Sequence, residues 1–153
     1  MDTTGLDNLL KEFPAPQARI LVFPHHGGLP GRGDPYEFAL KLCQAVKPET
    51  VIFSIGRGTK DTPRPEIIRG IRTATPHAHI ACTQLSKSCA DTLPSMEPLH
   101  LNNLPSRGRT SNSCCAGTIK LELDNLLLAY TPSLLKHRDF IEKEAANALC
   151  IKA

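Results

Sequence analysis

The sequence places two adjacent histidines, His25 and His26, directly after a short apolar run and at the start of a glycine-rich loop. The run at residues 20–23 is expected to be a buried strand, and residues 24–33 contain four glycines. Side chains at the end of such a strand lie at the mouth of an α/β fold, where ligands bind. His25 and His26 are therefore the first candidates for a binding site. The alternative is that both rings only hydrogen-bond the backbone of their own loop.

Cysteines form a second group of residues that could do chemistry. Four of the six lie in the middle of the chain, as a pair with six residues between them and then an adjacent pair: Cys82, Cys89, Cys114 and Cys115. Four thiolates could hold a structural zinc ion in tetrahedral geometry. The alternative is that they are buried free thiols, which behave as small apolar side chains. Cys43 and Cys150 are expected to be packing residues.

The tripeptide Gly56-Arg57-Gly58 is a third candidate, for binding an anionic substrate. Glycines let backbone N–H groups approach a phosphate closely. A plain turn has the same composition, so both interpretations stay open. Asp34 precedes Pro35 at the start of an apolar periodic segment, and this pattern indicates a helix cap and not a catalytic carboxylate.

Alternating strands and helices are predicted to position these residues. The periodicity indicates helix, strand, helix, strand, helix and strand at residues 6–13, 20–23, 35–47, 51–55, 62–74 and 79–83. The first helix has its apolar side chains on one stripe, at Leu6, Leu9, Leu10 and Phe13. Such an order predicts an α/β fold with parallel strand pairing.

The rest of the chain, from residue 84 on, is predicted to begin with a segment that lacks regular secondary structure. Residues 84–117 are rich in Pro, Ser and Asn and are expected to be a long irregular segment. Two strands follow, at residues 118–123 and 126–130, with a turn at Asp124-Asn125. A final helix is predicted from Pro132 to about Leu149, with an inward face made of Leu134, Leu135, Ile141, Ala145 and Leu149.

Composition limits the classes of function. The chain has 153 residues, 41% hydrophobic and 22% charged, with a formal net charge of +3. Aromatic residues do not interleave with the scattered basic ones, so no stacking platform for single-stranded nucleic acid is indicated. The longest apolar runs are too short to cross a bilayer, and the first residues do not read as a signal peptide. A cytoplasmic protein is predicted, in which cysteines are thiols or metal ligands.

Two stretches of the sequence carry a resemblance to a known family. One is Ile20-Leu21-Val22-Phe23-Pro24-His25-His26-Gly27-Gly28; the other runs from Ala45 to Gly56 and reads AVKPETVIFSIG. The first is similar to the strand and P-H-H-G-[GS] loop of metallo-β-lactamase-fold proteins. The second is similar to a phrase that follows this loop in the branch containing the soluble domain of the DNA-uptake channel proteins of bacterial competence. The resemblance covers residues 5–83 well and residues 117–124 loosely.

The resemblance implies a fold and a metal. Residues 1–153 would be the C-terminal half of an αββα sandwich, starting in mid-domain, with the irregular segment at 84–117 and a hairpin and helix at 118–150. In this family two zinc ions activate water, and His25 or His26 would bind the second of them, with His25 favoured. The loop at Gly56 would face the substrate. The family's first ligands, from an H-x-H-x-D-H loop, are missing from this chain, and the family's His before Pro in the polar loop is Arg64 here.

The function predicted from the resemblance is the C-terminal part of a zinc-dependent hydrolase, acting on phosphodiester bonds, that is inactive as an isolated chain. The missing ligands would come from a separate chain that supplies the N-terminal half of the fold. The alternative is a non-catalytic binding or regulatory half-domain, or a truncated reading frame. A half-fold leaves an apolar surface uncovered, so self-association is also predicted. Nucleic acid is compatible with this function as a substrate.

Overall fold

The computed structural model describes residues 1–58, 61–101, 103–122 and 129–152, and it is α/β, as predicted. The chain divides into two compact units. The N-terminal unit comprises Met1–Ser54 and Asp61–Ala81, and the C-terminal unit comprises Ile55–Lys60 and Cys82–Lys152.

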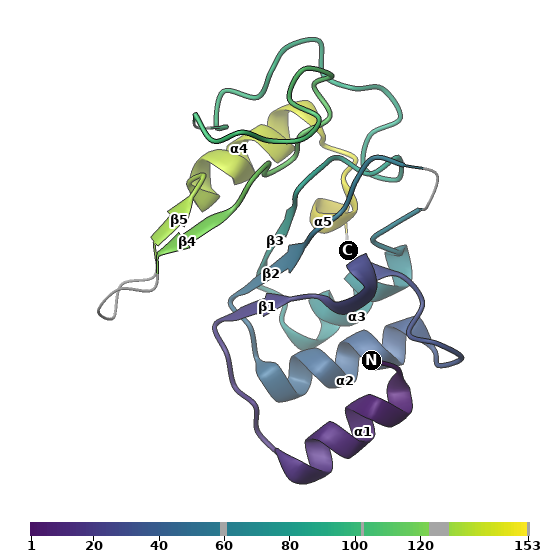
Figure 1. Cartoon of the computed structure of the whole chain (residues 1–153). Coiled ribbons are helices and arrows are strands. Elements are labelled where there is room, and N and C mark those ends of the chain that lie inside the picture. Colours follow the sequence, from purple (N-terminus) through teal and green to yellow (C-terminus); the bar gives the residue numbers. More distant parts are fainter. Residues whose placement is uncertain (59–60, 102, 123–128, 153) are drawn as a thin grey trace. The chain divides into compact units, whose positions relative to one another are not determined.

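The N-terminal unit is built on a three-stranded sheet. Its strands are β1 (Ile20–Val22), β2 (Thr50–Phe53) and β3 (His79–Cys82), in the order β1-β2-β3, with β1 and β2 parallel (Figure 1). All residues of β2 and β3 are buried, and all but Thr50 and His79 are apolar. The edge strand β1 is only half-buried, and Val22 is 61% exposed. The three strands lie where the sequence predicts them, within two residues at each end.

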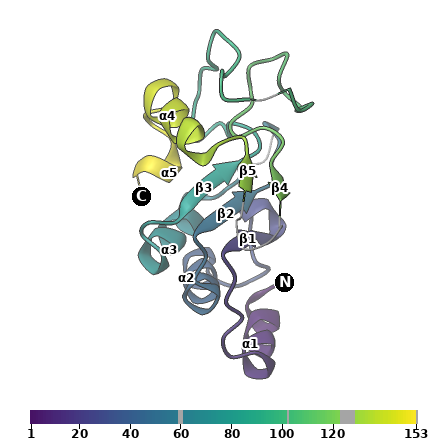
Figure 2. The same ribbon diagram turned by 90° about the vertical axis from the view of Figure 1, so that its left-hand side faces the viewer.

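Two helices pack side by side on one face of this sheet (Figures 1 and 2). They are α2 (Pro35–Val46) and α3 (Pro65–Ala74). The Asp34 side chain accepts a hydrogen bond of 3.0 Å from the backbone N–H of Glu37, which confirms the predicted cap. The buried residues of α2 form one apolar face: Phe38, Ala39, Leu42, Cys43 and Val46.

Two predictions for the N-terminal unit need correction. Helix α3 begins at Pro65 and not at Thr62, because Arg64 still has extended backbone angles. The first helix, α1 (Thr3–Glu12), buries only Leu6 of the predicted stripe. Phe13 is 62% exposed, because the helix ends one residue before it and the chain there leaves the helical path.

The C-terminal unit contains a hairpin, two helices and a long irregular segment. Strands β4 (Lys120–Glu122) and β5 (Ala129–Thr131) pair antiparallel, with Leu121 opposite Tyr130. Leu121 is more buried than Lys120 and Glu122, as the alternation predicts. The predicted turn and the strand residues at 123–128 lie outside the described residues. In the described part of segment 84–117, the only regular pairing is an isolated bridge between Gln84 and Cys114, so the predicted irregular character is confirmed.

The predicted C-terminal helix is two helices in the structure. Helix α4 (Leu134–Glu144) ends because Ala145 adopts φ −139°, and α5 (Leu149–Lys152) follows after a break. The inner face of α4 was predicted only in part, because Ile141 and Ala145 are buried as expected but other positions are not. His137, Phe140 and Ile141 are buried, whereas Leu135 is 72% exposed. The spacing of His137, Phe140 and Ile141 is helical. Because the face includes a histidine, it was not recognised in the sequence as a buried face.

Large apolar side chains remain exposed in the N-terminal unit. Phe13, Val22 and Leu29 are 62%, 61% and 55% exposed. An edge strand with an outward valine is a surface suited to pairing. The predicted self-association therefore remains a prediction with a structural basis. Among the described residues, none of the helices has both the length and the apolar character needed to cross a membrane.

Candidate functional site

The loop after β1 has an unusual backbone. Residues Pro24–Gly27 form a single short turn, η1, in which His25 and His26 have φ of 52° and 56° and Gly27 has φ of 74°. Three successive residues therefore lie in the left-handed region. For a residue with a Cβ this conformation costs on the order of 1–3 kcal/mol, and it persists only where the surroundings impose it. Such outliers concentrate at functional sites.

Contacts within the N-terminal unit impose this conformation. The His26 ring nitrogen Nδ1 donates a hydrogen bond to the carbonyl of Ser54, just after β2. The Gly27 carbonyl accepts a bond of 2.9 Å from the backbone N–H of Arg64, just before α3. Gly27 itself is buried against Phe53. The His-His loop is therefore attached both to the end of the next strand and to the start of α3.

These contacts distinguish the two histidines. Because a carbonyl can only accept, Nδ1 of His26 carries a proton, and in the neutral form of this exposed ring the lone pair is on Nε2. This is the arrangement of most metal-binding histidines, which donate the other ring N–H to a carbonyl or carboxylate. The Nε2 of His25 instead contacts the backbone of Met1, at 2.7 Å from its amino group and 3.1 Å from its carbonyl oxygen. The geometry favours His26 as the ligand, whereas the sequence favoured His25.

One imidazole does not make a zinc site. In the part of the chain that the structure describes, no three His, Cys, Asp or Glu side chains are grouped so that they could hold a metal ion. Catalytic zinc usually has three protein ligands and one water. A zinc ion at His26 would thus need ligands from outside these residues, as the resemblance implies.

The Gly56-Arg57-Gly58 candidate has a structural role in the C-terminal unit. The Arg57 guanidinium donates hydrogen bonds to the carbonyls of Leu85, Ser86 and Asp91, at 3.2, 3.0 and 2.9 Å. These donors fix the start of the irregular segment and are occupied. Binding of an anion by the backbone of this turn remains a prediction.

We expect Arg57→Ala to lower the free energy of unfolding by about 1–3 kcal/mol, because three carbonyls, two of them in partly buried contacts, lose charged donors. Urea unfolding followed by circular dichroism measures this. The matched control is Arg107→Ala, since Arg107 is exposed and only its backbone carbonyl is used, as an acceptor. It should change the stability by less than about 0.5 kcal/mol. Equal effects of the two substitutions would show that the Arg57 contacts do not matter.

The four central cysteines, Cys82, Cys89, Cys114 and Cys115, are all buried. All six cysteines of the chain are free thiols. The thiol of Cys114 is 3.4 Å from the carbonyl oxygen of Arg107. The Cys82 thiol instead lies within electrostatic range of Cys89, Cys115 and Cys150, and burial first, then these thiols, raises its pKa well above the ordinary value. Among the described residues, no three His, Cys, Asp or Glu side chains are grouped so that they could hold a metal ion, and a structural zinc site at Cys82, Cys89, Cys114 and Cys115 remains a prediction.

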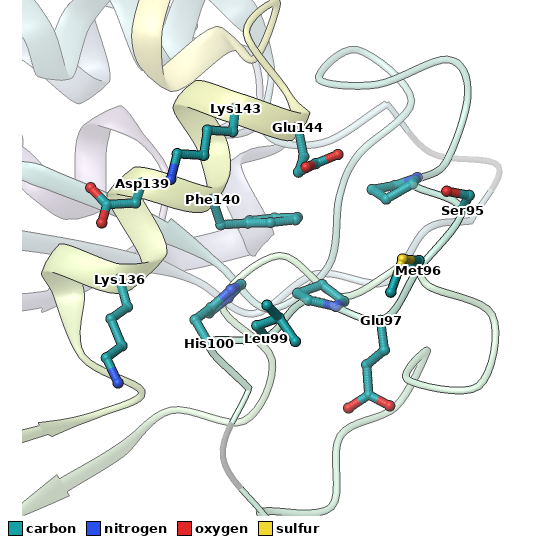
Figure 3. Close-up of a pocket in the computed structure, with 12 residues that line it drawn as sticks. Ser95, Met96, Glu97, Leu99, His100, Lys136, Asp139, Phe140, Lys143 and Glu144 are labelled. Atoms are coloured by element: carbon teal, nitrogen blue, oxygen red, sulfur yellow. The ribbon is translucent and has the colours of Figure 1, made fainter.

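A cavity of about 450 Å³ lies between α4 and residues 94–100 of the C-terminal unit (Figure 3). Lys136, Asp139, Lys143 and Glu144 contribute to its wall from α4, together with Phe140. His100 lines it from the irregular segment, with its ring 4.7 Å from the Phe140 ring. This cavity was not predictable from the apolar pattern of α4, because the leucines near the start of the helix indicate a different buried face. The wall carries both positively and negatively charged side chains, so its charge does not indicate one class of ligand.

Comparisons with protein-family models, with curated proteins and with solved structures found no match to this chain. The assignment of function therefore depends on the residues and the geometry described above.

Proposed function

We propose that the chain is the C-terminal part of a zinc-dependent hydrolase with a metallo-β-lactamase-like αββα fold, and that phosphodiesters are its substrates. One observation carries the proposal. His26 follows β1, is fixed by the carbonyl of Ser54 after β2, and keeps Nε2 available on an exposed ring. In α/β sheets, ligands bind outside the carboxyl ends of the strands.

The order of elements supports the proposal. A strand, a His-His-Gly loop, a helix and a parallel strand follow each other in the N-terminal unit, in the sequence order of the family. Zinc, when bound, would lower the pKa of a coordinated water to about 7 and so supply hydroxide at neutral pH. Within this chain, His26 would hold the ion and the Ser54 carbonyl would keep the ring in the right tautomer.

Because His26 alone cannot complete a zinc site, the proposed function requires a partner chain that supplies further ligands. The exposed Val22 on the edge strand β1 supports docking of a chain that supplies the N-terminal half of the fold. The same feature supports the second candidate function, a non-catalytic module that binds a partner or a second copy through this edge.

The test measures zinc-dependent hydrolysis of bis(p-nitrophenyl) phosphate and of a β-lactam. We expect only background turnover from the isolated chain, because it lacks the H-x-H-x-D-H ligands. Mixed with a separately produced N-terminal half that carries those ligands, the chain should hydrolyse the phosphodiester. His26→Ala should abolish this turnover. His77→Ala is the control, since His77 is exposed in the turn before β3 and should leave turnover unchanged.

Two results would contradict the proposal. Zinc-dependent turnover by the isolated chain would show that the missing ligands are not needed. A stable complex of the two halves without turnover would exclude the hydrolase and leave the binding module.

A further inference from the structure

The cavity between α4 and residues 94–100 has a floor that contacts within the C-terminal unit hold in place. The Nε2–H of His100 donates a hydrogen bond of 2.6 Å to the carbonyl oxygen of Cys115, and the Phe140 ring lies 4.7 Å from the His100 ring. Both rings are buried. The volume of about 450 Å³ is typical of sites for small ligands, which are usually largely formed before the ligand binds.

The opposite wall, residues 94–100, is tied to the rest of the unit by an ion pair between Glu97 and Arg109, so the charge of Glu97 is compensated. Two large apolar side chains of this wall nonetheless face solvent, since Met96 is 72% and Leu99 is 97% exposed. Exposed apolar side chains grouped at the mouth of a cavity are typical of a binding site. An apolar group of a ligand would cover them.

The net charge of the wall indicates no class of ligand, but the positions of the charges along α4 do. Lys136 and Glu144 line the cavity eight residues apart, about 12 Å along the helix, with Phe140 between them (Figure 3). The other two charged residues of α4 in the wall are Asp139 and Lys143. They are four positions apart, a spacing at which opposite charges compensate each other, and the Lys143 side chain extends toward Asp139 in Figure 3. A positive charge at one end and a negative charge at the other are left over.

The stability of the chain does not explain these two end charges. In the described part of the chain, neither Lys136 nor Glu144 forms an ion pair. Lys136 is in the first turn of α4, and Glu144 is its last residue. The helix dipole favours the opposite arrangement, with negative charge at the start of a helix and positive charge at its end. A ligand with a carboxylate near Lys136 and a cation near Glu144 would offset both unfavourable placements.

We propose that this cavity binds a short apolar peptide with free ends, three or four residues long, with its ammonium group at Glu144 and its carboxylate at Lys136. An extended chain advances about 3.3–3.6 Å per residue, so three or four residues span the distance of about 12 Å between the two charges. An apolar side chain of the peptide covers Phe140 and Leu99. Such a ligand matches both signs of charge, which a simple anion, a simple cation or a purely apolar compound does not. The site is independent of His26 and of the proposed hydrolase.

The test is an amide NMR titration of the full chain with the tripeptide leucyl-phenylalanyl-leucine. We expect saturable shift changes that concentrate in residues 94–100 and in α4. Two modified peptides then probe the ends on the unmodified chain, because N-acetylation removes the ammonium charge and C-terminal amidation removes the carboxylate charge. Each should bind at least about fivefold more weakly, since one charged contact is lost. The peptide blocked at both ends should bind more weakly than either.

Two substitutions assign the ends. Glu144→Gln should weaken the binding of the free tripeptide but not that of its N-acetylated form, and Lys136→Gln should weaken the free tripeptide but not the C-terminal amide. The control is Glu142→Gln, an exposed residue of α4 that does not line the cavity, and it should leave the affinity unchanged. Neither Glu144→Gln nor Lys136→Gln should lower the midpoint of urea unfolding, which separates a loss of binding from a loss of folding.

Three results would overturn the proposal. The first is the absence of saturable binding of the tripeptide to the unmodified chain. The second is an affinity that is unchanged when both ends are blocked, or that depends on one end only, because the cavity would then be a site for an apolar compound, an anion or a cation. The third is a Glu144→Gln variant that binds the N-acetylated and the free tripeptide with equal losses of affinity.

Discussion

Gly27→Ala should lower the free energy of unfolding by about 2–4 kcal/mol, the sum of a backbone and a steric cost. Gly27 has φ of +74°, where a side chain is strained. A Cβ at this position would lie 2.6 Å from Cβ of Pro63 and 2.7 Å from a ring carbon of Phe53. Both neighbours are stiff, and Phe53 is fully buried in β2, so neither can move away easily. Urea unfolding followed by circular dichroism measures the change.

The control for this substitution is Gly58→Ala. A Cβ at Gly58 would meet no atom within 4 Å, and the residue is exposed. We expect a change of less than about 0.5 kcal/mol. If Gly27→Ala were as mild as Gly58→Ala, the left-handed turn would not be imposed by its surroundings, and the fixed orientation of His26 would lose its basis.

The position of the His-His loop was predictable from the sequence, but its geometry was not. An apolar run followed by Pro24 and several glycines predicts a strand and a loop, because these signals are local. The left-handed angles of His25 and His26 depend instead on hydrogen bonds to Ser54 and Arg64, which are distant in sequence. No local pattern reports which ring nitrogen is used for such a contact.

The same contrast between local patterns and long-range contacts explains why the arrangement of the cysteines was not predictable. The sequence offered Cys114 and Cys115 only as two of four thiolates that could hold one zinc ion. Whether neighbouring side chains share a face depends on the backbone between them, and here the bridge to Gln84 makes it extended at Cys114.

Helices were predicted well where caps and an unbroken apolar stripe agree. In α2, the Asp34 cap and the apolar face from Phe38 to Val46 both indicate the same helix. In α4, the leucines near its start suggested the wrong face, because tertiary contacts bury His137 and leave Leu135 exposed.

Gly70 was not singled out by the sequence, yet its replacement should have a large effect. It lies in the middle of α3, where the backbone of α2 comes close. A Cβ would lie 2.5 Å from the carbonyl oxygen of Tyr36, 2.9 Å from Cβ of Ala39 and 3.0 Å from the backbone N of Leu40. Two of these atoms belong to the backbone of a capped helix, so they cannot turn aside as a flexible side chain would.

We expect Gly70→Ala to destabilise the chain by about 1–3 kcal/mol, the usual range for overpacking a well-packed contact. The substitution also gains about 1 kcal/mol of helix propensity, since alanine is the better helix former. The steric cost should exceed this gain, because relief requires the whole of α2 to move away from α3. Urea unfolding of the single variant gives the net value.

A double-mutant cycle with Ala39→Gly tests whether the cause is the contact between the helices. Removing Cβ of Ala39 relieves one of the three close approaches and leaves the other two. The double variant should therefore be more stable than the sum of the two single effects predicts, by at least about 0.5 kcal/mol. Strict additivity would mean that the two residues do not interact across the α2–α3 contact. A Gly70→Ala variant more stable than the unmodified chain would mean that the helices separate at little cost and that propensity alone decides the outcome.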